Sequence, residues 1–403
     1  MTVNAQHVRD IEAEHVLQVY NRIPVVFVRG AGSRLFDADG KEYLDFLSGI
    51  GVASLGHSNT DLADALHQQA AELVHTSNLY FHPLQGEVAS RLTTISGLDR
   101  VFFTNSGTEA VEACLKFARR YWHTHDERDR TGIVAFERSF HGRTFGSLSV
   151  TSGSAYREPF QPLVPGVTFV SPDDPAALRA AVTNKTAAII VEPMQGEGGV
   201  WPISAAMAEA IGTATSTTGT LLIADEIQCG LGRTGRHFYA ETLGLTPDLM
   251  SLGKALGAGV PVGAALVSQR VADAVHFGDH GSTYGGNLLA CRAALVFLQA
   301  LENGLLERVG TAGTRLEAGL RTLAASIPAV RSVRGDGLMW GLDVDEPVAE
   351  RMVQAALERG LLINRTAGTV IRMLPPLTVS DGDIDEGLAR LSASLEDAAV
   401  EAT

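Results

Sequence analysis

The amino-acid sequence predicts an α/β fold in which helices cover both faces of a large, mostly parallel sheet, with a smaller α+β domain beside it. Short apolar runs recur between about residues 100 and 270, and spacers of helical or loop length separate most of them. Residues 1–73 contain a hairpin-like stretch that turns at Asp39-Gly40, and residues 315–403 mix helices with short strands. We therefore expect 1–73 and 315–403 to pair into the small domain, and residues 74–314 to form the large one.

The strands of the large sheet are expected at the runs RVFFTN, GIVAF, VTFV, AAIIVEP, TLLIADE, DLMSL and GAALV. Two charged residues come directly after such runs, because Asp225 follows TLLIA and Lys254 follows DLMSLG. Ligands of open parallel sheets bind beyond the carboxyl ends of the strands. Both side chains are therefore expected at one rim of the sheet.

A helix is expected to begin directly after RVFFTN. Ser106 and Glu109 have the spacing of a capping box, and apolar residues then recur along one face of the helix. Gly107 allows a close approach of the backbone, and the free N–H groups of a helix start favour an anion. Ser106, Gly107 and Thr108 are therefore candidates for a phosphate site, and an ordinary helix cap is the alternative.

Composition narrows the possible partners. The chain has 32 Lys and Arg against 46 Asp and Glu, a formal net charge of −14, which argues against nucleic acid or an anionic membrane as a general partner. No apolar run is long enough to span a bilayer, and the N-terminus lacks the features of a secretory signal, so the cytoplasm is the expected compartment.

The three cysteines are scattered and the histidines lack metal-ligand spacing, so we expect free thiols and no metal site. His57 and His141 are interpreted as satisfied loop or core histidines.

The two carboxylates of Asp225 and Glu226 at the end of an apolar strand need a partner, because an unpaired buried carboxylate costs several kcal/mol. Lys254 stands between an apolar strand and a glycine-rich segment, where desolvation would lower the pKa of its amine and make it nucleophilic. The segment FHGR adds the aromatic face of Phe140 and the guanidinium of Arg143. An ordinary solvated lysine and an ordinary surface loop are the alternatives.

One ligand uses all of these groups. The helix start suits a phosphate, Phe140 the face of a flat ring, Asp225 a protonated ring nitrogen and Lys254 an aldehyde. Pyridoxal 5'-phosphate has each of these parts, and its protonated nitrogen would be the cation that faces Asp225.

Seven motifs, in chain order, strengthen this hypothesis: NSGTEA, FHGRT, VEPMQGEGG, ADEIQCGLGRTG, GKALGAGVPVGA, HGSTYGGN and IRMLPPL. Together they resemble the class III (subgroup II) pyridoxal-phosphate aminotransferases of fold type I over nearly the whole chain. HTSNLYF, YREPFQPLVPG and IRMLPPLTVSDGDIDEGL most resemble the acetylornithine aminotransferases of arginine biosynthesis. The chain departs from the family pattern at GHSNT (56–60), at Val111 and at Leu288.

The resemblance implies roles in cofactor binding and catalysis. Lys254 resembles the Schiff-base lysine that also shuttles the substrate proton, and Asp225 resembles the partner of the ring nitrogen. Gln228 would lie near the ring hydroxyl and Phe140 against the ring. Thr283 would reach the phosphate of a neighbouring subunit, with Ser282 near the substrate, so the family pattern implies a homodimer with shared active sites.

Two arginines match the carboxylate-binding positions of the family. Arg143 would hold the α-carboxylate of acetylornithine, and Arg372 would hold that of glutamate. Glu197 in QGEGG resembles a gate that pairs with the second arginine when the substrate leaves that arginine free. A strand-edge salt bridge for Arg372 and a solvated loop position for Glu197 are the alternatives.

The resemblance thus implies a ping-pong reaction in which N2-acetyl-L-ornithine gives its terminal amine to the cofactor and 2-oxoglutarate takes it to become glutamate. Alternatives on the same fold are ornithine, succinylornithine, succinyldiaminopimelate or 4-aminobutyrate aminotransferase. Glutamate-1-semialdehyde aminomutase, an isomerase that needs no oxo-acid acceptor, is more remote. A nucleotide-binding or dehydrogenase scaffold ranks last, because no GxGxxG opens a helix after the first strand.

Overall fold

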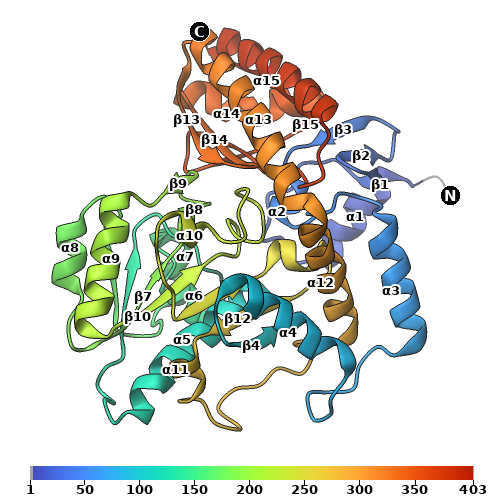
Figure 1. The fold of residues 1–403 in the computed structure, drawn as a ribbon. Helices are drawn as coiled ribbons and strands as arrows, with labels where there is room; N and C mark the ends of the chain where they lie inside the picture. Colours follow the sequence, from blue (N-terminus) through green and yellow to red (C-terminus); the bar gives the residue numbers. More distant parts are fainter. Residues whose placement is uncertain (1–2, 403) are drawn as a thin grey trace.

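The computed structural model describes residues 3–402, and a seven-stranded sheet lies at its centre (Figure 1). In spatial order the strands are β4 (Arg100–Thr104), β12 (Gly263–Val267), β11 (Leu249–Leu252), β10 (Leu221–Asp225), β7 (Thr186–Val191), β5 (Gly132–Phe136) and β6 (Val167–Val170). The ladder from β11 to β6 is parallel, whereas β12 is antiparallel to both of its neighbours. The predicted α/β fold with a mostly parallel sheet is confirmed.

The central strand β10 shows why its sequence is an uninterrupted apolar run. Leu221 and Ile223 belong to one buried cluster, together with apolar residues of α5 (Gly107–Thr124). Leu222 and Ala224 belong to a second cluster, together with residues of α8 (Pro175–Ala181) and α9 (Ala205–Thr218). Both faces of the sheet are covered, so successive residues of the strand are all buried.

Helix α5 follows β4 as its periodicity predicts. Ser106 is the N-cap, and its hydroxyl accepts the backbone N–H of Glu109 at 3.4 Å. The Glu109 carboxylate accepts the backbone N–H of Asn105 at 2.7 Å, so it satisfies a donor one residue before the position it would bind in a capping box. The residues of this helix that are buried include Val111, Cys114, Leu115, Ala118 and Trp122.

The two ends of the chain meet in one small sheet. Strands β1 (Phe27–Ala31), β2 (Arg34–Asp37) and β3 (Glu42–Asp45) form a meander, and β2 and β3 are joined by the turn at Asp39 and Gly40. Strand β15 (Leu361–Leu362) then pairs in parallel with β3. The N-terminal helices are α1 (Ala5–His15), α3 (Thr60–Glu72) and α4 (Pro83–Ser96).

A second C-terminal sheet has the order β13 (Val330–Asp336), β14 (Met339–Val344), β17 (Val370–Met373) and β16 (Asn364–Thr366). The helices around it are α13 (Leu306–Ser326), α14 (Glu346–Glu358) and α15 (Asp381–Ala402). They lie above the large sheet in Figure 1. The short elements elsewhere are α2 (Ser48–Gly51), α6 (Phe145–Ser149), α7 (Ser154–Arg157), η1 (Glu158–Phe160), β8 (Met194–Gln195), β9 (Trp201–Pro202), α10 (Tyr239–Thr242), η2 (Lys254–Gly257) and α11 (Gln269–Ala272).

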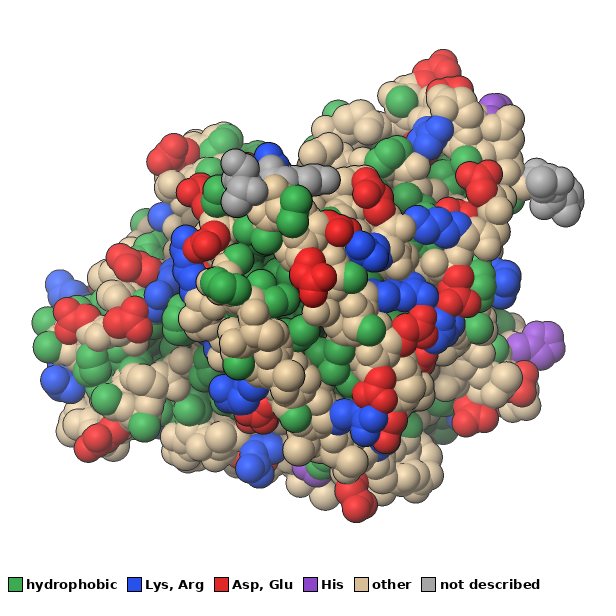
Figure 2. All heavy atoms as spheres, turned by 90° about the horizontal axis from the view of Figure 1, so that it is seen from above, with side chains coloured by type: hydrophobic (Ala, Val, Ile, Leu, Met, Phe, Trp, Pro, Cys, Tyr) green, Lys and Arg blue, Asp and Glu red, His purple; other side chains and the backbone are tan. Residues whose placement is uncertain are grey.

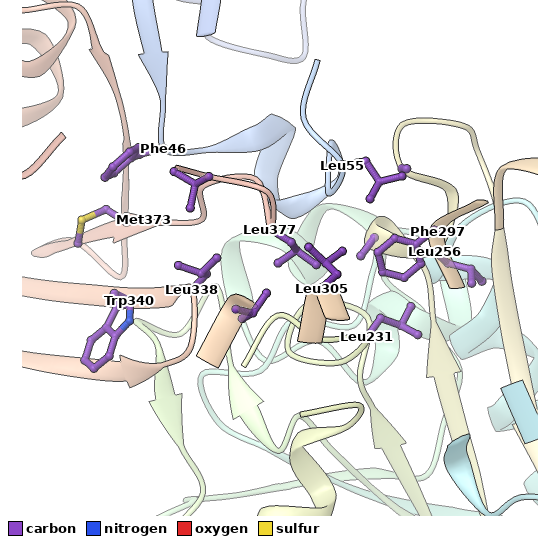
Figure 3. Close-up of a cluster of buried hydrophobic side chains, with 14 of the residues drawn as sticks. Phe46, Leu55, Leu231, Leu256, Phe297, Leu305, Leu338, Trp340, Met373 and Leu377 are labelled. Carbon is purple, nitrogen blue, oxygen red and sulfur yellow. The ribbon is translucent and has the colours of Figure 1, made fainter. Parts of the chain in front are cut away.

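One hydrophobic cluster joins the terminal parts to the large sheet. Figure 3 shows Phe46 near the N-terminal sheet, Leu256 and Phe297 from the centre, and Met373 from β17 within this cluster. All of these side chains are buried, so the parts share one continuous apolar contact.

The helix segments α12 (Leu288–Ala300), η3 (Leu301–Leu305) and α13 follow one another directly, with a kink at Asn303 and Gly304. Residues 288–326 are long and apolar enough, by length and composition alone, to cross a membrane, although the sequence runs suggested no such span. Half of the apolar window is buried inside the protein. The face of α12 that includes Cys291, Ala294 and Phe297 packs in the main core, as expected for a core helix. Figure 2 shows acidic and basic side chains interspersed on the face seen from above.

Candidate active site

Asp225 is the last residue of β10 and is only 3% exposed. Its Oδ2 lies 2.7 Å from Nδ1 of His141, and its Oδ1 accepts the backbone N–H of Ile227 at 3.1 Å. The Nε2 atom of His141 is buried without a hydrogen-bond partner among the described residues. The protein therefore holds Asp225 with an imidazole and one backbone amide. We expected His141 to be an ordinary satisfied histidine, and its contact with Asp225 was not predicted. The feature of the sequence that could have indicated this contact is the position of His141 in FHGRT, beside Phe140.

The adjacent carboxylate of Glu226 serves a different purpose. Its Oε1 accepts the backbone N–H of Ala240 at 2.7 Å, and its Oε2 lies 3.0 Å from the thiol sulfur of Cys229. Burial raises the pKa of Glu226 to about 7. Of the two neighbouring carboxylates, Glu226 thus fastens the following loop, and Asp225 is the one joined to His141.

Lys254 begins the short η2 helix directly after β11, with a backbone φ of 38°. A positive φ is uncommon for a lysine and indicates a backbone held by its surroundings. Burial, followed by the positive charge of Arg372, lowers the pKa of the Lys254 amine to about 8. The negative charges of Glu197 and Asp225 act on the same amine in the opposite direction and raise its pKa, but by less than burial lowers it. A large fraction of Lys254 is therefore neutral near pH 8.

The start of α5 lies against the segment that carries Lys254. A Cβ atom on Gly253 would approach the Cα of Gly107 to 3.1 Å, and a Cβ on Gly107 would lie 2.7 Å from Cδ1 of Ile227. Only glycine fits at position 107 without displacing Ile227. The first backbone N–H groups of this helix have no acceptor within the helix, as at any helix start.

The Thr108 hydroxyl connects α5 to the FHGRT loop. It lies 2.6 Å from the hydroxyl of Ser147 and accepts the backbone N–H of Arg143 at 3.2 Å. The Phe140 backbone N–H donates to Oε1 of Glu192 at 2.8 Å, while Oε2 of Glu192 accepts the backbone N–H of Gly196 at 3.0 Å. The buried Glu192, which the sequence reading did not single out, thus links the Phe140 loop to the QGEGG loop.

Arg372 lies on β17 and its side chain is fully buried. Its Nη1 donates to Oε1 of Glu197 at 2.6 Å and to Oε1 of Gln228 at 3.0 Å, and its Nε donates to Oδ1 of Asn364 at 3.2 Å. Nη2 is buried without a partner among residues 3–402. Burial raises the pKa of Glu197, but the Arg372 charge and hydrogen bond lower it to a value below its ordinary range. Three of the predicted residues therefore form one group.

Ser282 and Thr283 lie on a loop near the start of α5. The Ser282 hydroxyl accepts the backbone N–H of Gly285 at 3.0 Å and the side-chain amide of Asn105 at 3.2 Å. Thr283 is exposed, and its side chain has no hydrogen bond within residues 3–402. Within the described part of the chain, Thr283 forms no hydrogen bond with Lys254 or Asp225.

The three departures from the family pattern occupy structural positions. Val111 is fully buried in α5, and Leu288 is buried at the start of α12. In GHSNT, Nε2 of His57 lies 2.8 Å from Oδ2 of the buried Asp45. His57 thus fastens this loop to the end of β3.

Comparison with known proteins agrees with this geometry. A family model described as aminotransferase class-III matches residues 16–395. Acetylornithine aminotransferase from Methanocaldococcus jannaschii is 44% identical over 377 residues, which are 93% of this chain and 94% of that protein. The corresponding protein of Gloeobacter violaceus is 46% identical over 380 residues, 94% of this chain and 95% of that protein.

Solved structures give the same result. The ornithine aminotransferase of Toxoplasma gondii superposes with a TM-score of 0.94 at 33% identity, covering 99% of this chain and 96% of that one. The acetylornithine aminotransferase of Elizabethkingia anophelis superposes with a TM-score of 0.87 at 30% identity, covering 98% of this chain and all of that one. With Asp225 and Lys254 at the ends of the neighbouring strands β10 and β11, the chain belongs to the class-III aminotransferases, which depend on pyridoxal 5'-phosphate.

Proposed function

We propose that the protein transfers the terminal amine of N2-acetyl-L-ornithine to 2-oxoglutarate, giving N-acetylglutamate semialdehyde and glutamate. This proposal rests on the contrast between two arginines. Arg372 is paired with Glu197 at 2.6 Å, whereas Arg143 makes no ion pair with any described residue. Arg143 is thus free to bind a carboxylate, which acetylornithine and glutamate both have. Arg372 becomes available only when the second carboxylate of glutamate displaces Glu197. The curated relatives that bear the acetylornithine aminotransferase name support this choice.

The residues fit the cofactor. We assign its phosphate to the N-terminus of α5 at Gly107 and Thr108, where the backbone N–H groups lack helical acceptors. We assign its ring to the face of Phe140 and its ring nitrogen to Asp225, whose second partner His141 keeps the carboxylate oriented. Gln228, which follows Asp225 by three residues and accepts a hydrogen bond from Arg372, is assigned to the ring hydroxyl.

When bound, pyridoxal 5'-phosphate acts as an electron sink for the substrate carbon that bears the amine. Lys254 supplies the amine that holds the cofactor aldehyde, and a pKa of about 8 keeps much of that amine neutral. During turnover Lys254 moves a proton between the substrate carbon and the cofactor carbon through Nζ. The carboxylate of Asp225 stabilises positive charge on the ring nitrogen.

The protein holds the amino donor by its carboxylates. Arg143 binds the α-carboxylate of acetylornithine, so that the distal amine points toward Lys254. Arg372 binds the α-carboxylate of glutamate after Glu197 has moved aside. Ser282 is assigned to the substrate side of the site. The acetyl group removes the positive charge of the α-amine, so acetylornithine presents no second cation to the site.

A second candidate substrate is ornithine, because a neighbour with a TM-score of 0.94 is an ornithine aminotransferase. Ornithine differs by an unblocked α-amine. We rank it second because the acetylornithine aminotransferases of Methanocaldococcus jannaschii and Gloeobacter violaceus are 44% and 46% identical to this chain, against 33% for that neighbour.

We also propose a homodimer with shared active sites, in which Thr283 reaches the phosphate bound by a second copy. Aromatic side chains on the same side are strongly exposed: Phe81 and Phe277 are accessible to 105% and 111% of their reference areas. Phe81 lines a groove together with Pro83, Phe102 and Ser282, and Phe277 lines a second groove that shares Phe102 with the first. Large exposed apolar side chains at a groove support an interface between copies.

Two further points remain proposals. The chain divides into a large domain, residues 74–314, and a small domain formed by 1–73 and 315–403, supported by the pairing of β15 with β3. The compartment is the cytoplasm, supported by three buried free cysteines, which suit a reducing environment.

The visible absorption spectrum tests the proposed function. The protein loaded with cofactor is titrated with acetylornithine, ornithine and 4-aminobutyrate separately, in the absence of any oxo acid. We expect the visible band to bleach at the lowest concentration with acetylornithine, and 2-oxoglutarate to restore it. Bleaching at lower concentration with ornithine or 4-aminobutyrate would replace the substrate and keep the mechanism. A protein that binds no pyridoxal 5'-phosphate would refute the assignments of Asp225 and Lys254.

A further inference from the structure

Arg143 is a charged residue without a charged partner. Its side chain is exposed, and it makes no ion pair with any residue between 3 and 402. Its backbone N–H donates to the Thr108 hydroxyl at 3.2 Å, so its main chain is fastened to the start of α5. A free arginine side chain loses about 2 kcal/mol of rotamer entropy when it is fixed. A substrate-binding arginine therefore needs something that orients it before the substrate arrives.

The side chain next to Arg143 is Tyr156, on the short helix α7. The Cζ atom of Arg143 lies 3.8 Å from the centroid of the Tyr156 ring and 5.6 Å from that of Phe140. The two rings meet edge to face, with centroids 6.2 Å apart and an interplanar angle of 83°. Tyr156 thus contacts both the arginine assigned to the substrate and the aromatic ring assigned to the cofactor.

A tyrosine ring is better suited than a carboxylate to orient the Arg143 guanidinium before the substrate binds. A carboxylate at this place would neutralise the guanidinium and occupy its N–H donors, and a substrate would have to displace it, as at Arg372 and Glu197. The face of a ring attracts the guanidinium plane and leaves the donors at its edge available. The Tyr156 hydroxyl has no hydrogen bond within the described residues, so only the ring takes part.

The local backbone leaves room for the ring. A Cβ atom on Gly153 would lie 2.9 Å from Cδ2 of Tyr156, closer than such contacts allow. The φ of Gly153 is −62°, which any residue can adopt. Glycine at this position is therefore explained by the neighbouring ring rather than by its own backbone.

We propose that Tyr156 is a positioning residue that sets substrate specificity, because its ring holds the Arg143 guanidinium oriented and unpaired for the carboxylate of the amino donor. The proposal rests on the proposed function, since Arg143 must bind that carboxylate. Tyr156 acts through its contacts with Arg143 and Phe140, and it is assigned no contact with the reacting amine. Its loss should therefore weaken binding of carboxylate-bearing donors and leave the chemistry of bound substrate intact.

The test compares two amines that differ only in the carboxylate: N2-acetylornithine and N-acetylputrescine. We expect Tyr156→Leu to raise KM for acetylornithine about tenfold and to leave kcat and the KM for N-acetylputrescine within about twofold. Tyr156→Phe, which keeps the ring, should match the wild type. Gly153→Ala should displace the ring and change the same KM in the same direction. Phe160→Leu removes an exposed ring of the same segment and serves as the matched control, with no change expected.

A binding measurement separates positioning from turnover. N-acetylnorvaline has the carboxylate of acetylornithine but lacks the reacting amine, so calorimetry reports its affinity alone. We expect Tyr156→Leu to weaken this affinity about tenfold as well. The proposal is wrong if Tyr156→Leu leaves the KM for acetylornithine unchanged or raises both KM values equally. If the wild type itself does not prefer acetylornithine to N-acetylputrescine, the assignment of Arg143 in the proposed function fails first, and the role of Tyr156 fails with it.

Discussion

Nδ1 of His141 lies 2.7 Å from Oδ2 of Asp225, and both side chains are buried at the end of the central strand. A buried carboxylate requires partners, and this one has an imidazole and the backbone amide of Ile227. We propose that His141 keeps Asp225 in one orientation and leaves the carboxylate available to the ring nitrogen of the cofactor.

The first prediction compares how much kcat falls when each member of this pair is replaced. Asp225→Asn should lower kcat by at least about 100-fold, because an amide cannot stabilise the charge on the ring nitrogen, and a lost charged partner costs about 3–5 kcal/mol. His141→Gln should lower kcat by only about tenfold, because it removes orientation and leaves the charge. Steady-state kinetics on protein saturated with cofactor measures both values. A larger loss in His141→Gln than in Asp225→Asn would contradict this order.

The second prediction concerns the pH dependence of cofactor uptake. Only the neutral amine of Lys254 can attack an aldehyde, and the pKa of that amine is lowered to about 8. The neutral fraction, and hence the uptake rate, should rise about tenfold between pH 7 and pH 9 and then level off. Stopped-flow absorbance after mixing the cofactor-free protein with pyridoxal 5'-phosphate measures this rate. Lys254→Ala should show neither the uptake phase nor turnover, and turnover within a few-fold of wild type would refute the assignment.

The third prediction tests the pair formed by Glu197 and Arg372. Glu197→Gln removes the charge that competes with the second carboxylate of glutamate, so KM for glutamate should fall about three- to tenfold. Acetylornithine presents only one carboxylate, so its KM should not fall. Glu209→Gln, at an exposed site on α9, provides the control for loss of one negative charge. If both KM values fall together, Glu197 does not discriminate between the two donors.

The fourth prediction concerns stability. Burial raises the pKa of Glu226 from 4.5 to about 7, so the folded protein binds this proton more tightly than the unfolded chain does between those values. The group therefore contributes least to stability once the pH has risen above 7, where its buried carboxylate is ionised. Glu226→Gln carries no charge, so its melting temperature relative to wild type should be higher at pH 8 than at pH 5.5. Differential scanning calorimetry at both values measures this difference, and an equal offset would contradict it.

The fifth prediction tests the shared active site. Lys254→Ala and Thr283→Ala chains should each have little activity when they are assembled alone. After the chains are mixed and reassorted, half of the dimers are hybrids in which one site has both native residues, so about a quarter of wild-type turnover should return. If Thr283 served the site of its own chain, mixing would give no recovery above the average of the two variants.

Much of the site could be predicted from local pattern. An uninterrupted apolar strand followed by a charged residue places that residue at the rim, so the positions of Asp225 and Lys254 followed from their strands. The start of α5 followed from the cap at Ser106 and from the helical spacing of apolar residues after it. These features depend on neighbours in the chain, which is why sequence reveals them.

The partners of the charged groups could not be predicted in this way. His141 and Asp225 are 84 positions apart, and no local pattern joins them. Arg372 and Glu197 are 175 positions apart, and their pairing was expected only from the family resemblance. Periodicity indicates which face of an element is buried, but not which distant side chain will lie against it. The family resemblance assigned Asp225 to the cofactor, but the sequence did not reveal that Glu226 would bind the backbone of Ala240 and the thiol of Cys229.

By itself, the sequence determined the order and type of the elements around the site, the residues at the strand ends and the family resemblance, because hydrophobic period, capping and motif order are properties of short segments. Only the tertiary structure decided that His141 contacts Asp225, that Glu192 joins two loops, and that Arg143 rests on Tyr156. These contacts arise when elements distant in the chain pack together and their buried polar groups must find partners.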